Sequence, residues 1–202
     1  LKLGLNIWIT NPDNLTFYDG RISYTAFKVK DLSLKLNKPK KIFLEEFDLF
    51  FIRQDPPFDM KYISNCYLLE LHQKFNKKPF FINDPTGIKN FTEKIFPLYF
   101  HNLMPKTMVS SSVRDLEYMF KKHKTLVMKP LYCKGGEDIY KFSRKDGDAL
   151  RTFQTLLSKY KSPVVIQKFI EKVKYGDKRV ILVNGKAVGA VNRIPQSGAF
   201  KA

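Results

Sequence analysis

The sequence predicts an α/β fold with a parallel sheet in its N-terminal part. Segments rich in β-branched and aromatic residues alternate with segments of helical periodicity along most of the 202 residues. The apolar run Leu49 to Ile52 is short and stops before Pro56 and Pro57, which is typical of a parallel strand buried on both faces. Asn184-Gly185 lies between two apolar runs and indicates a β-hairpin near the C-terminus.

The first quarter of the chain is expected to form strands. Leu1 to Asn6 and Ile7 to Thr10 are consecutive apolar runs. Asp19-Gly20 supplies the positive φ angles of a tight turn, so Leu15–Tyr18 and Arg21–Tyr24 are predicted to form a hairpin. A lysine-rich linker then leads to the predicted buried strand.

Two helices are expected around the next strand. Asp59 is suited to cap a helix that runs to about Lys77. The apolar face of this helix is predicted to contain Tyr62, Cys66, Leu69 and Phe75. Pro79 to Ile82 is the following strand, and Asp84-Pro85 has the pattern of an N-cap with proline at the first helical position.

Strands and helices are expected to alternate again in the second half of the chain. Ser112 and Asp115 resemble a capping box at the start of a helix that ends near His123. A second helix is predicted over Ala149–Tyr160. The predicted strands are Lys106–Val109, Thr125–Lys129, Ile139–Ser143 and Val164–Phe169.

The net charge of +17 suggests an anionic partner, but the distribution of the charge argues against nucleic acid. The lysines are spread as singlets and pairs, without a long basic block or an arginine-rich arm. A hydrophobic content of 44% argues against disorder, and no apolar stretch approaches the length of a membrane span. We therefore expect a protein that binds neither nucleic acid nor membrane.

The cysteines and histidines show no metal-ligand spacing. Cys66 and Cys133 are far apart, which favours two reduced thiols in a cytoplasmic protein. His72, His101 and His123 are expected at the surface or at helix ends. No residue is predicted to ligate a metal.

Charged residues follow the predicted buried strand at Ile52. Arg53, Asp55 and Asp59 lie where the chain must leave the sheet, and ligands of open α/β sheets bind outside the carboxyl ends of the strands. An arginine beside a stiff, carboxylate-bearing turn is suited to hold a small zwitterionic or acidic molecule. The alternative is a surface turn with solvated charges.

Lys129 ends an apolar strand and precedes a short glycine-containing segment. A lysine in such a strand is costly to desolvate unless an anion meets it. Gly135 and Gly136 have bare backbones that can approach phosphate oxygens closely. Alternatively, the lysine extends to the surface and the glycines form a tight turn.

The predicted C-terminal hairpin carries Asp177, Arg179 and Arg193 at its open end. A two-residue turn at Asn184-Gly185 pairs Arg179 with Ala190, and a regular ladder then places Arg193 on the opposite face. Both arginines can serve one site only if the ladder twists or ends early. The alternative is an arginine pair on a solvated hairpin edge.

A series of motifs resembles the prokaryotic glutathione synthetase family of ATP-grasp ligases. R-x-D-P-P-F-D at Arg53–Asp59 is followed by M-K-Y-I-x-x-x-Y-L-L-E. The same order and rough spacing continue through Asn83–Pro85, Asn90–Phe96, Val127–Gly136, Gln167–Phe169, Gly176–Val180 and Arg193–Gln196. Collinear motifs over most of the chain are more specific than any one short match.

The resemblance implies an ATP-grasp architecture with an N-terminal Rossmann-like domain over residues 1–93 and an ATP-grasp domain over 94–202. It implies that Arg179 is catalytic and that Arg53, Asp55 and Arg193 bind the substrate. The nucleotide-binding residues that it implies are Lys94, Lys129, Gly135, Gly136, Gln167, Lys168, Phe169, Ile170 and Asp177. Lys134 to Glu137 would be a small phosphate-covering loop, although Cys133 stands where the family usually has glycine.

The implied reaction joins γ-glutamylcysteine to glycine with ATP and Mg²⁺, through an acyl phosphate, in a homo-oligomeric enzyme. The family also has a helix where Asn6 meets Ile7 and an acidic, metal-binding lobe after Ala202, so we expect the sequence to omit segments. Another ATP-grasp ligase would share the nucleotide residues without sharing Arg53 to Asp59. A basic nucleic-acid-binding protein is the alternative from a different class.

Overall fold

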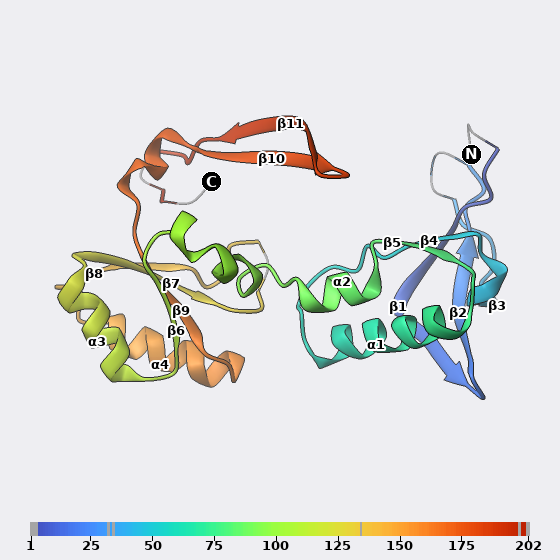
Figure 1. Ribbon diagram of the computed structural model, residues 1–202, viewed down its shortest axis with the longest axis horizontal. Helices are drawn as coiled ribbons and strands as arrows, with labels where there is room; N and C mark the ends of the chain where they lie inside the picture. Colours follow the sequence, from blue (N-terminus) through green and yellow to red (C-terminus); the bar gives the residue numbers. More distant parts are fainter. Residues whose placement is uncertain (1–3, 32, 34, 134, 198, 201–202) are drawn as a thin grey trace. The chain divides into compact units, whose positions relative to one another are not determined.

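A computed structural model describes residues 4–31, 33, 35–133, 135–197 and 199–200 (Figure 1). The chain divides into two compact units, Leu1–Phe96 and Pro97–Ala202.

The N-terminal unit contains an antiparallel sheet in the order β1 (Trp8–Tyr18), β2 (Arg21–Lys28) and β3 (Lys40–Phe43). Asp19 and Gly20 have φ angles of 47° and 77°, which confirms the predicted hairpin turn. The strand predicted over residues 1–6 is not found in its described part, since residues 4–6 belong to no strand.

A parallel strand pair follows in the same unit. β4 (Leu49–Phe51) pairs with β5 (Phe80–Ile82) after a short 3₁₀ turn, η1 (Leu44–Glu46). The prediction that β4 is buried on both faces is wrong, because Leu49 and Phe51 are 44% and 57% exposed. Phe50 packs against the hydrophobic core instead, so β4 shows the alternating burial of a strand covered on one face.

The two helices of this unit begin at the predicted caps. Asp59 accepts a hydrogen bond from the Tyr62 N–H at 2.9 Å and starts α1 (Met60–Phe75). Asp84 accepts from the Gly87 N–H at 2.7 Å and starts α2 (Pro85–Asn90).

The predicted apolar face of α1 is correct for three positions and wrong for the fourth. Tyr62, Cys66 and Leu69 are buried, whereas Phe75 is the last helical residue and is 73% exposed. His72 lies in the last turn of α1, one of the two predicted places, but it is buried at 4% exposure rather than exposed at the surface. Its burial is possible because its Nε2 hydrogen-bonds to the Lys78 carbonyl at 2.7 Å.

The C-terminal unit is built on an antiparallel four-stranded sheet in the order β6-β9-β7-β8. The strands are β6 (Thr107–Ser110), β7 (Thr125–Pro130), β8 (Tyr140–Ser143) and β9 (Val164–Lys168), and a 3₁₀ segment, η2 (Phe96–Leu103), precedes them. Both α3 (Val113–Lys122) and α4 (Ala149–Tyr160) cover one face of this sheet (Figure 1).

The core of the C-terminal unit lies between the sheet and these two helices. Phe153 and Leu156 of α4 meet Leu126 and Met128 of β7, and all four are at most 1% exposed. None of the helices in the described ranges combines the length and apolar character needed to cross a bilayer.

The predicted capping box of α3 does not form. Ser112 occupies the N-cap position without a side-chain hydrogen bond. Asp115 instead accepts a hydrogen bond from the Ser110 hydroxyl at 2.5 Å. The Asp115 carboxylate therefore binds the Ser110 side chain at the end of β6 and does not complete a capping box.

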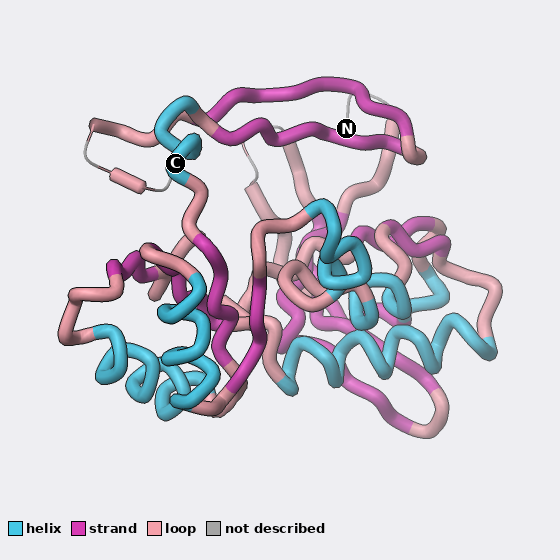
Figure 2. Tube along the Cα trace, turned by 60° about the vertical axis from the view of Figure 1, so that its left-hand side comes forward, coloured by secondary structure: helices cyan, strands magenta, loops and turns pink. Residues whose placement is uncertain are grey.

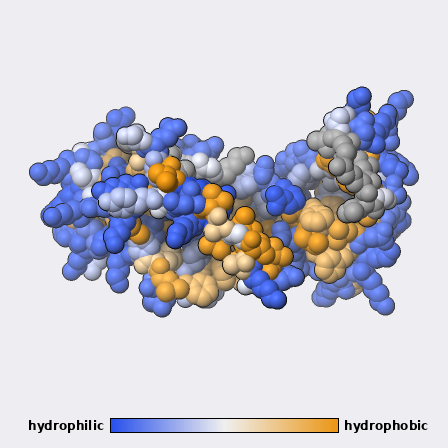
Figure 3. Space-filling model, turned by 90° about the horizontal axis from the view of Figure 1, so that it is seen from above, coloured by the Kyte–Doolittle hydropathy of each residue, from blue (hydrophilic) through white to orange (hydrophobic). Residues whose placement is uncertain are grey.

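A 3₁₀ turn, η3 (Glu171–Tyr175), leads into a separate hairpin of β10 (Asp177–Val183) and β11 (Lys186–Arg193), drawn as two long neighbouring strands in Figure 2. Asn184 and Gly185 have φ angles of 48° and 75°, which confirms the turn. In the described structure the hairpin pairs with no further strand. Its apolar side chains are exposed, and Figure 3 shows hydrophobic side chains among the hydrophilic ones of one face of the molecule.

Candidate functional site

The face of the four-stranded sheet that points away from α3 and α4, called the free face below because neither of these helices covers it, carries the first group of candidate residues. Leu126, Met128 and Ile166 point into the core below α3 and α4. Because side chains alternate along a strand, Lys129 and Gln167 project from the opposite face. The structure therefore brings together two residues that are 38 positions apart in the sequence.

A chain of hydrogen bonds connects these side chains across three strands. The Lys129 ammonium donates to the Gln167 Oε1 at 2.9 Å. The Gln167 amide nitrogen donates to the Thr107 Oγ1 at 2.7 Å. Thr107 and Gln167 are direct partners in the ladder of β6 and β9, so the backbone register fixes this contact.

Phe169 continues the same alternation just beyond β9, and a lysine that the sequence did not single out lies over it. The Lys141 Nζ is 4.1 Å from the centroid of the Phe169 ring, within the range of a cation–π contact. Phe142 packs against the core, so Lys141 belongs to the free face of β8. The alternation in Y-K-F-S contained this signal, because only one of two neighbouring residues can face the helices.

Lys168 and Ile170 are exposed at the end of β9. The backbone N–H of Lys168 donates to the Lys106 carbonyl at 2.9 Å, and that of Phe169 donates to the Thr125 carbonyl at 3.1 Å. Two backbone N–H groups of the expected nucleotide-binding segment are therefore engaged within the sheet.

The glycine pair after β7 has the backbone conformation that makes glycine necessary. Gly135 and Gly136 have φ angles of 63° and 74°, in the left-handed region that other residues rarely adopt. Cys133 donates its thiol hydrogen to the Glu137 carbonyl at 3.2 Å and closes the segment across its base. Lys134, part of the predicted phosphate-covering loop, lies outside the described residues.

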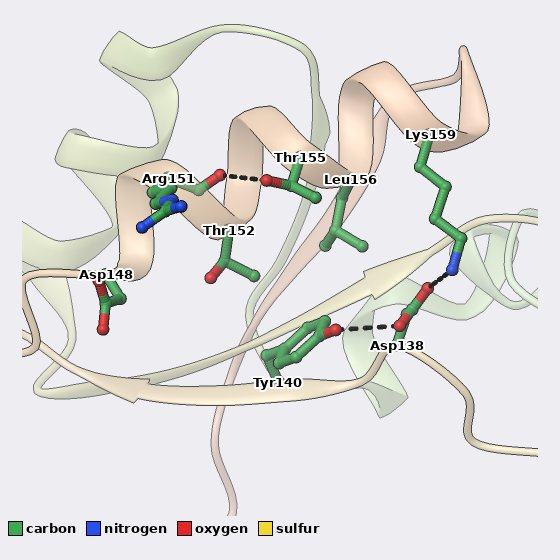
Figure 4. A pocket seen from close by; sticks show the side chains of 8 residues that line it. All are labelled: Asp138, Tyr140, Asp148, Arg151, Thr152, Thr155, Leu156 and Lys159. Carbon is green, nitrogen blue, oxygen red and sulfur yellow. Dashed lines mark hydrogen bonds and ion pairs between the residues drawn. The ribbon is translucent and has the colours of Figure 1, made fainter.

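Asp138 anchors the end of this segment to α4 (Figure 4). It accepts hydrogen bonds from Lys159 at 2.5 Å, Tyr160 at 2.6 Å and Tyr140 at 2.9 Å. These donors, Lys159 first, lower the pKa of Asp138 to about 2. A cavity of about 360 Å³ lies beside it, lined by Asp138, Tyr140, Asp148, Arg151, Thr152, Thr155, Leu156 and Lys159.

A register shift in the ladder of β10 and β11 puts Arg179 and Arg193 on the same face of the hairpin. Val183 pairs with Lys186 beside the turn. At Ile181 the pairing shifts by one residue, so that Val188 of β11 has no partner and forms a bulge. The shift persists from there to the open end of the hairpin. Arg179 therefore pairs with Val191, and the predicted pairing with Ala190 is wrong.

The offset puts all three candidate residues of the hairpin on one face. Asp177 pairs directly with Arg193 and forms an ion pair with it. Arg179 lies two residues from Asp177 and shares its face. Gly176 supports this end of the hairpin, because it has a φ of 105° and a Cβ there would come within 3.0 Å of the Arg193 carbonyl oxygen.

The candidate residues of the N-terminal unit lie near the carboxyl end of β4. Arg53 and Asp55 are exposed, and their neighbour Ile52 donates its N–H to the Ile82 carbonyl at 2.5 Å. Asp59 caps α1 through its Oδ1, which accepts the hydrogen bond from the Tyr62 N–H. Lys94 lies in a turn before η2 with its side chain 12% exposed and 3.4 Å from Glu93.

Within the described ranges, no three or more His, Cys, Asp or Glu side chains are grouped so that they could hold a metal ion. The donor set that Mg²⁺ prefers, several oxygen ligands around one point, is therefore not provided by these residues.

Family models match both halves of the chain. The model described as prokaryotic glutathione synthetase, N-terminal domain, matches residues 1–89. The model described as prokaryotic glutathione synthetase, ATP-grasp domain, matches residues 93–202. The resemblance seen in the motifs and the predicted α/β, ATP-grasp architecture are both confirmed.

Individual relatives agree with these matches. The chain is 41% identical over 160 residues to the glutathione synthetase of Bradyrhizobium diazoefficiens, covering 79% of this chain and 50% of that protein. It is 34% identical over 201 residues to the glutathione synthetase of Agrobacterium fabrum, covering 95% of this chain and 61% of that protein.

The chain thus spans between half and two-thirds of the length of these relatives. Among solved structures, it is similar to a D-cycloserine synthetase, with a TM-score of 0.45 and 19% identity over 58% of this chain and 41% of that one. From the two family models and the relatives, the chain belongs to the prokaryotic glutathione synthetase family.

Proposed function

We propose that this protein is an ATP-dependent ligase that joins γ-glutamylcysteine to glycine to form glutathione. The observation that carries the proposal is the match of both halves of the chain to glutathione synthetase domains. The free face of the four-stranded sheet supports it, because an ammonium group, an amide and an aromatic ring lie together on the face that points away from α3 and α4.

The proposed nucleotide site consists of this face together with the glycine segment. Lys129 would hold phosphate oxygens, and Gly135 and Gly136 would bring backbone N–H groups close to them. Phe169 would supply an apolar wall for the base, and Lys141 is added to the site because it lies over that ring. The other proposed nucleotide contacts are Lys94, Gln167, Lys168, Ile170 and Asp177.

The reaction would proceed in two steps. The substrate carboxylate would take the γ-phosphoryl group of ATP, and the glycine amine would then displace phosphate from the acyl phosphate. Cationic groups lower the barrier by neutralising charge that spreads over the phosphoryl oxygens. We assign this role to Arg179, with Lys129 and Lys94 on the nucleotide.

Mg²⁺ is proposed as the cofactor through the family. Because the described residues do not supply its ligands, no step of the reaction is derived through it. A domain boundary between residues 93 and 94, a cytoplasmic location, a homo-oligomeric state and the lack of a nucleic-acid or membrane partner are further proposals.

Arg53, Asp55 and Arg193 are proposed to bind the peptide substrate. A guanidinium can grip a carboxylate through two parallel hydrogen bonds, which a lysine cannot reproduce. Arg53→Lys and Arg193→Lys should therefore raise the KM for γ-glutamylcysteine and leave that for ATP nearly unchanged. Equal weakening of both substrates would show that the arginines maintain the structure instead.

The direct test is a ligation assay on the intact protein with ATP, γ-glutamylcysteine and glycine, following glutathione and ADP together. The proposal predicts equal amounts of the two products. ADP formation only with a different carboxylate and amine would identify another ATP-grasp ligase. Binding of a short duplex that weakens steeply with salt, without ADP formation, would favour the nucleic-acid alternative.

A further inference from the structure

Thr107 is the far end of the hydrogen-bond chain that begins at Lys129. Its hydroxyl donates to the Pro105 carbonyl at 2.7 Å and accepts from the Gln167 amide nitrogen at 2.7 Å. The side chain is half-buried on the free face of β6. Thr107 belongs to none of the motifs that identified the family.

The groups at the two ends of this series of hydrogen bonds determine which atom donates and which accepts in each of them. A carbonyl oxygen such as that of Pro105 only accepts, so the Thr107 hydroxyl hydrogen is committed to it. The hydroxyl oxygen must then accept from its second partner, which places the NH₂ end of the Gln167 amide toward Thr107. The Gln167 Oε1 is left facing the Lys129 ammonium, which only donates.

We propose that Thr107 is a positioning residue for Lys129, acting through the orientation of the Gln167 amide. This inference rests on the proposed function, since it concerns the nucleotide site of that function. With the hydroxyl present, the amide offers its oxygen to the ammonium group and holds it on the free face of the sheet.

Loss of the hydroxyl would remove one of the two groups that fix the orientation of the amide and leave only the Lys129 ammonium to do so. A rotated amide would present its NH₂ group to the Lys129 ammonium, so that two donors would face each other. It would also leave a half-buried amide nitrogen without its described acceptor. Lys129 would then sample positions away from the phosphate-binding geometry, and ATP affinity would fall.

Two variants of Thr107 separate the hydroxyl from the packing of the side chain. Thr107→Val keeps the branched shape and removes the hydroxyl, whereas Thr107→Ser keeps the hydroxyl and removes a methyl group. ATP titration of the intact protein should show about a three- to tenfold weaker Kd for Thr107→Val, the range expected for one net hydrogen bond. Thr107→Ser should remain within about twofold of the unmodified protein.

A double-mutant cycle with Lys129→Ala distinguishes positioning from a general structural effect. If Thr107 acts through Lys129, adding Thr107→Val to Lys129→Ala should not weaken ATP binding further. Additive losses, or an unchanged Kd in Thr107→Val, would overturn the proposal while leaving the nucleotide site in place. An unchanged Kd in Lys129→Ala would overturn the nucleotide site itself, and the role of Thr107 with it.

Discussion

The free face of the four-stranded sheet and the β10–β11 hairpin hold their candidate residues in different ways. Lys129 projects from a strand with a neighbour on each side and a buried core beneath it. Arg179 and Arg193 project from a ribbon of two strands whose apolar side chains are exposed. The sheet fixes its residues by tertiary packing, whereas the hairpin fixes its residues by turn and register.

This difference shows that local chemistry alone can align a set of charged side chains. The Asn184-Gly185 turn sets one register, and the bulge at Val188 converts it into another that pairs Asp177 with Arg193. No core residue takes part in that alignment. Single substitutions in the core of the sheet and in the hairpin test this difference.

The largest loss in the free energy of unfolding is expected for a substitution in the core between the sheet and its helices. Phe153 is 0% exposed and lies between α4 and the strands, so Phe153→Ala should destabilise the protein by about 3–5 kcal/mol. Ile181→Ala is the matched change on the hairpin, where the side chain is 49% exposed, and should cost at most about 1 kcal/mol. Urea unfolding of the 202-residue chain measures both. Equal losses would contradict the contrast between the two regions.

A smaller loss of stability is expected for a substitution at the open end of the hairpin. Gly176→Ala must place a Cβ at a φ of 105° and within 3.0 Å of the Arg193 carbonyl oxygen, which should cost about 1–3 kcal/mol and loosen the pairing of Asp177 with Arg193. Gly189→Ala in the same hairpin meets open space and serves as the control. NMR contacts between β10 and β11 report the register. Intact contacts in Gly176→Ala would show that the glycine is not required there.

The smallest effect concerns the pH dependence that Asp138 contributes. Its pKa is lowered from 3.8 to about 2 in the folded protein, so the ionised carboxylate favours folding. That contribution is fully present above pH 3.8 and is lost as the pH falls toward about 2.

Asp138→Asn should therefore lower the Tm at neutral pH and flatten its decline over this acid range. Melting curves across the acid range, with Asp148→Asn on the same cavity as the matched variant, check this expectation. A decline as steep in Asp138→Asn as in the unmodified protein would assign the acid sensitivity to other carboxylates.

Features encoded by neighbouring residues could be predicted from the sequence. The caps at Asp59 and Asp84, the bounds of α4 and the Asn184-Gly185 turn all follow from residues within a few positions of one another. The family could be predicted as well, because its motifs are collinear along the chain.

Features that depend on how the folded backbone places a partner or shifts a register could not be predicted in the same way. The burial of His72 requires the carbonyl of Lys78 in the loop after α1. The contact of Thr107 with Gln167 joins residues 60 positions apart, and only the strand order reveals it. The bulge at Val188 depends on the balance between turn and ladder, which composition does not express.

Binding of ATP by Lys129 and the free face of the sheet is the central expectation for this protein. Calorimetric titration of ATP into the intact protein and into Lys129→Ala tests this, with Lys124→Ala as a control for an exposed lysine just before β7. We expect Lys129→Ala to bind ATP at least about tenfold more weakly, as for a lost charge-assisted contact, and Lys124→Ala to bind it normally. An unchanged ATP affinity in a folded Lys129→Ala variant would contradict the account.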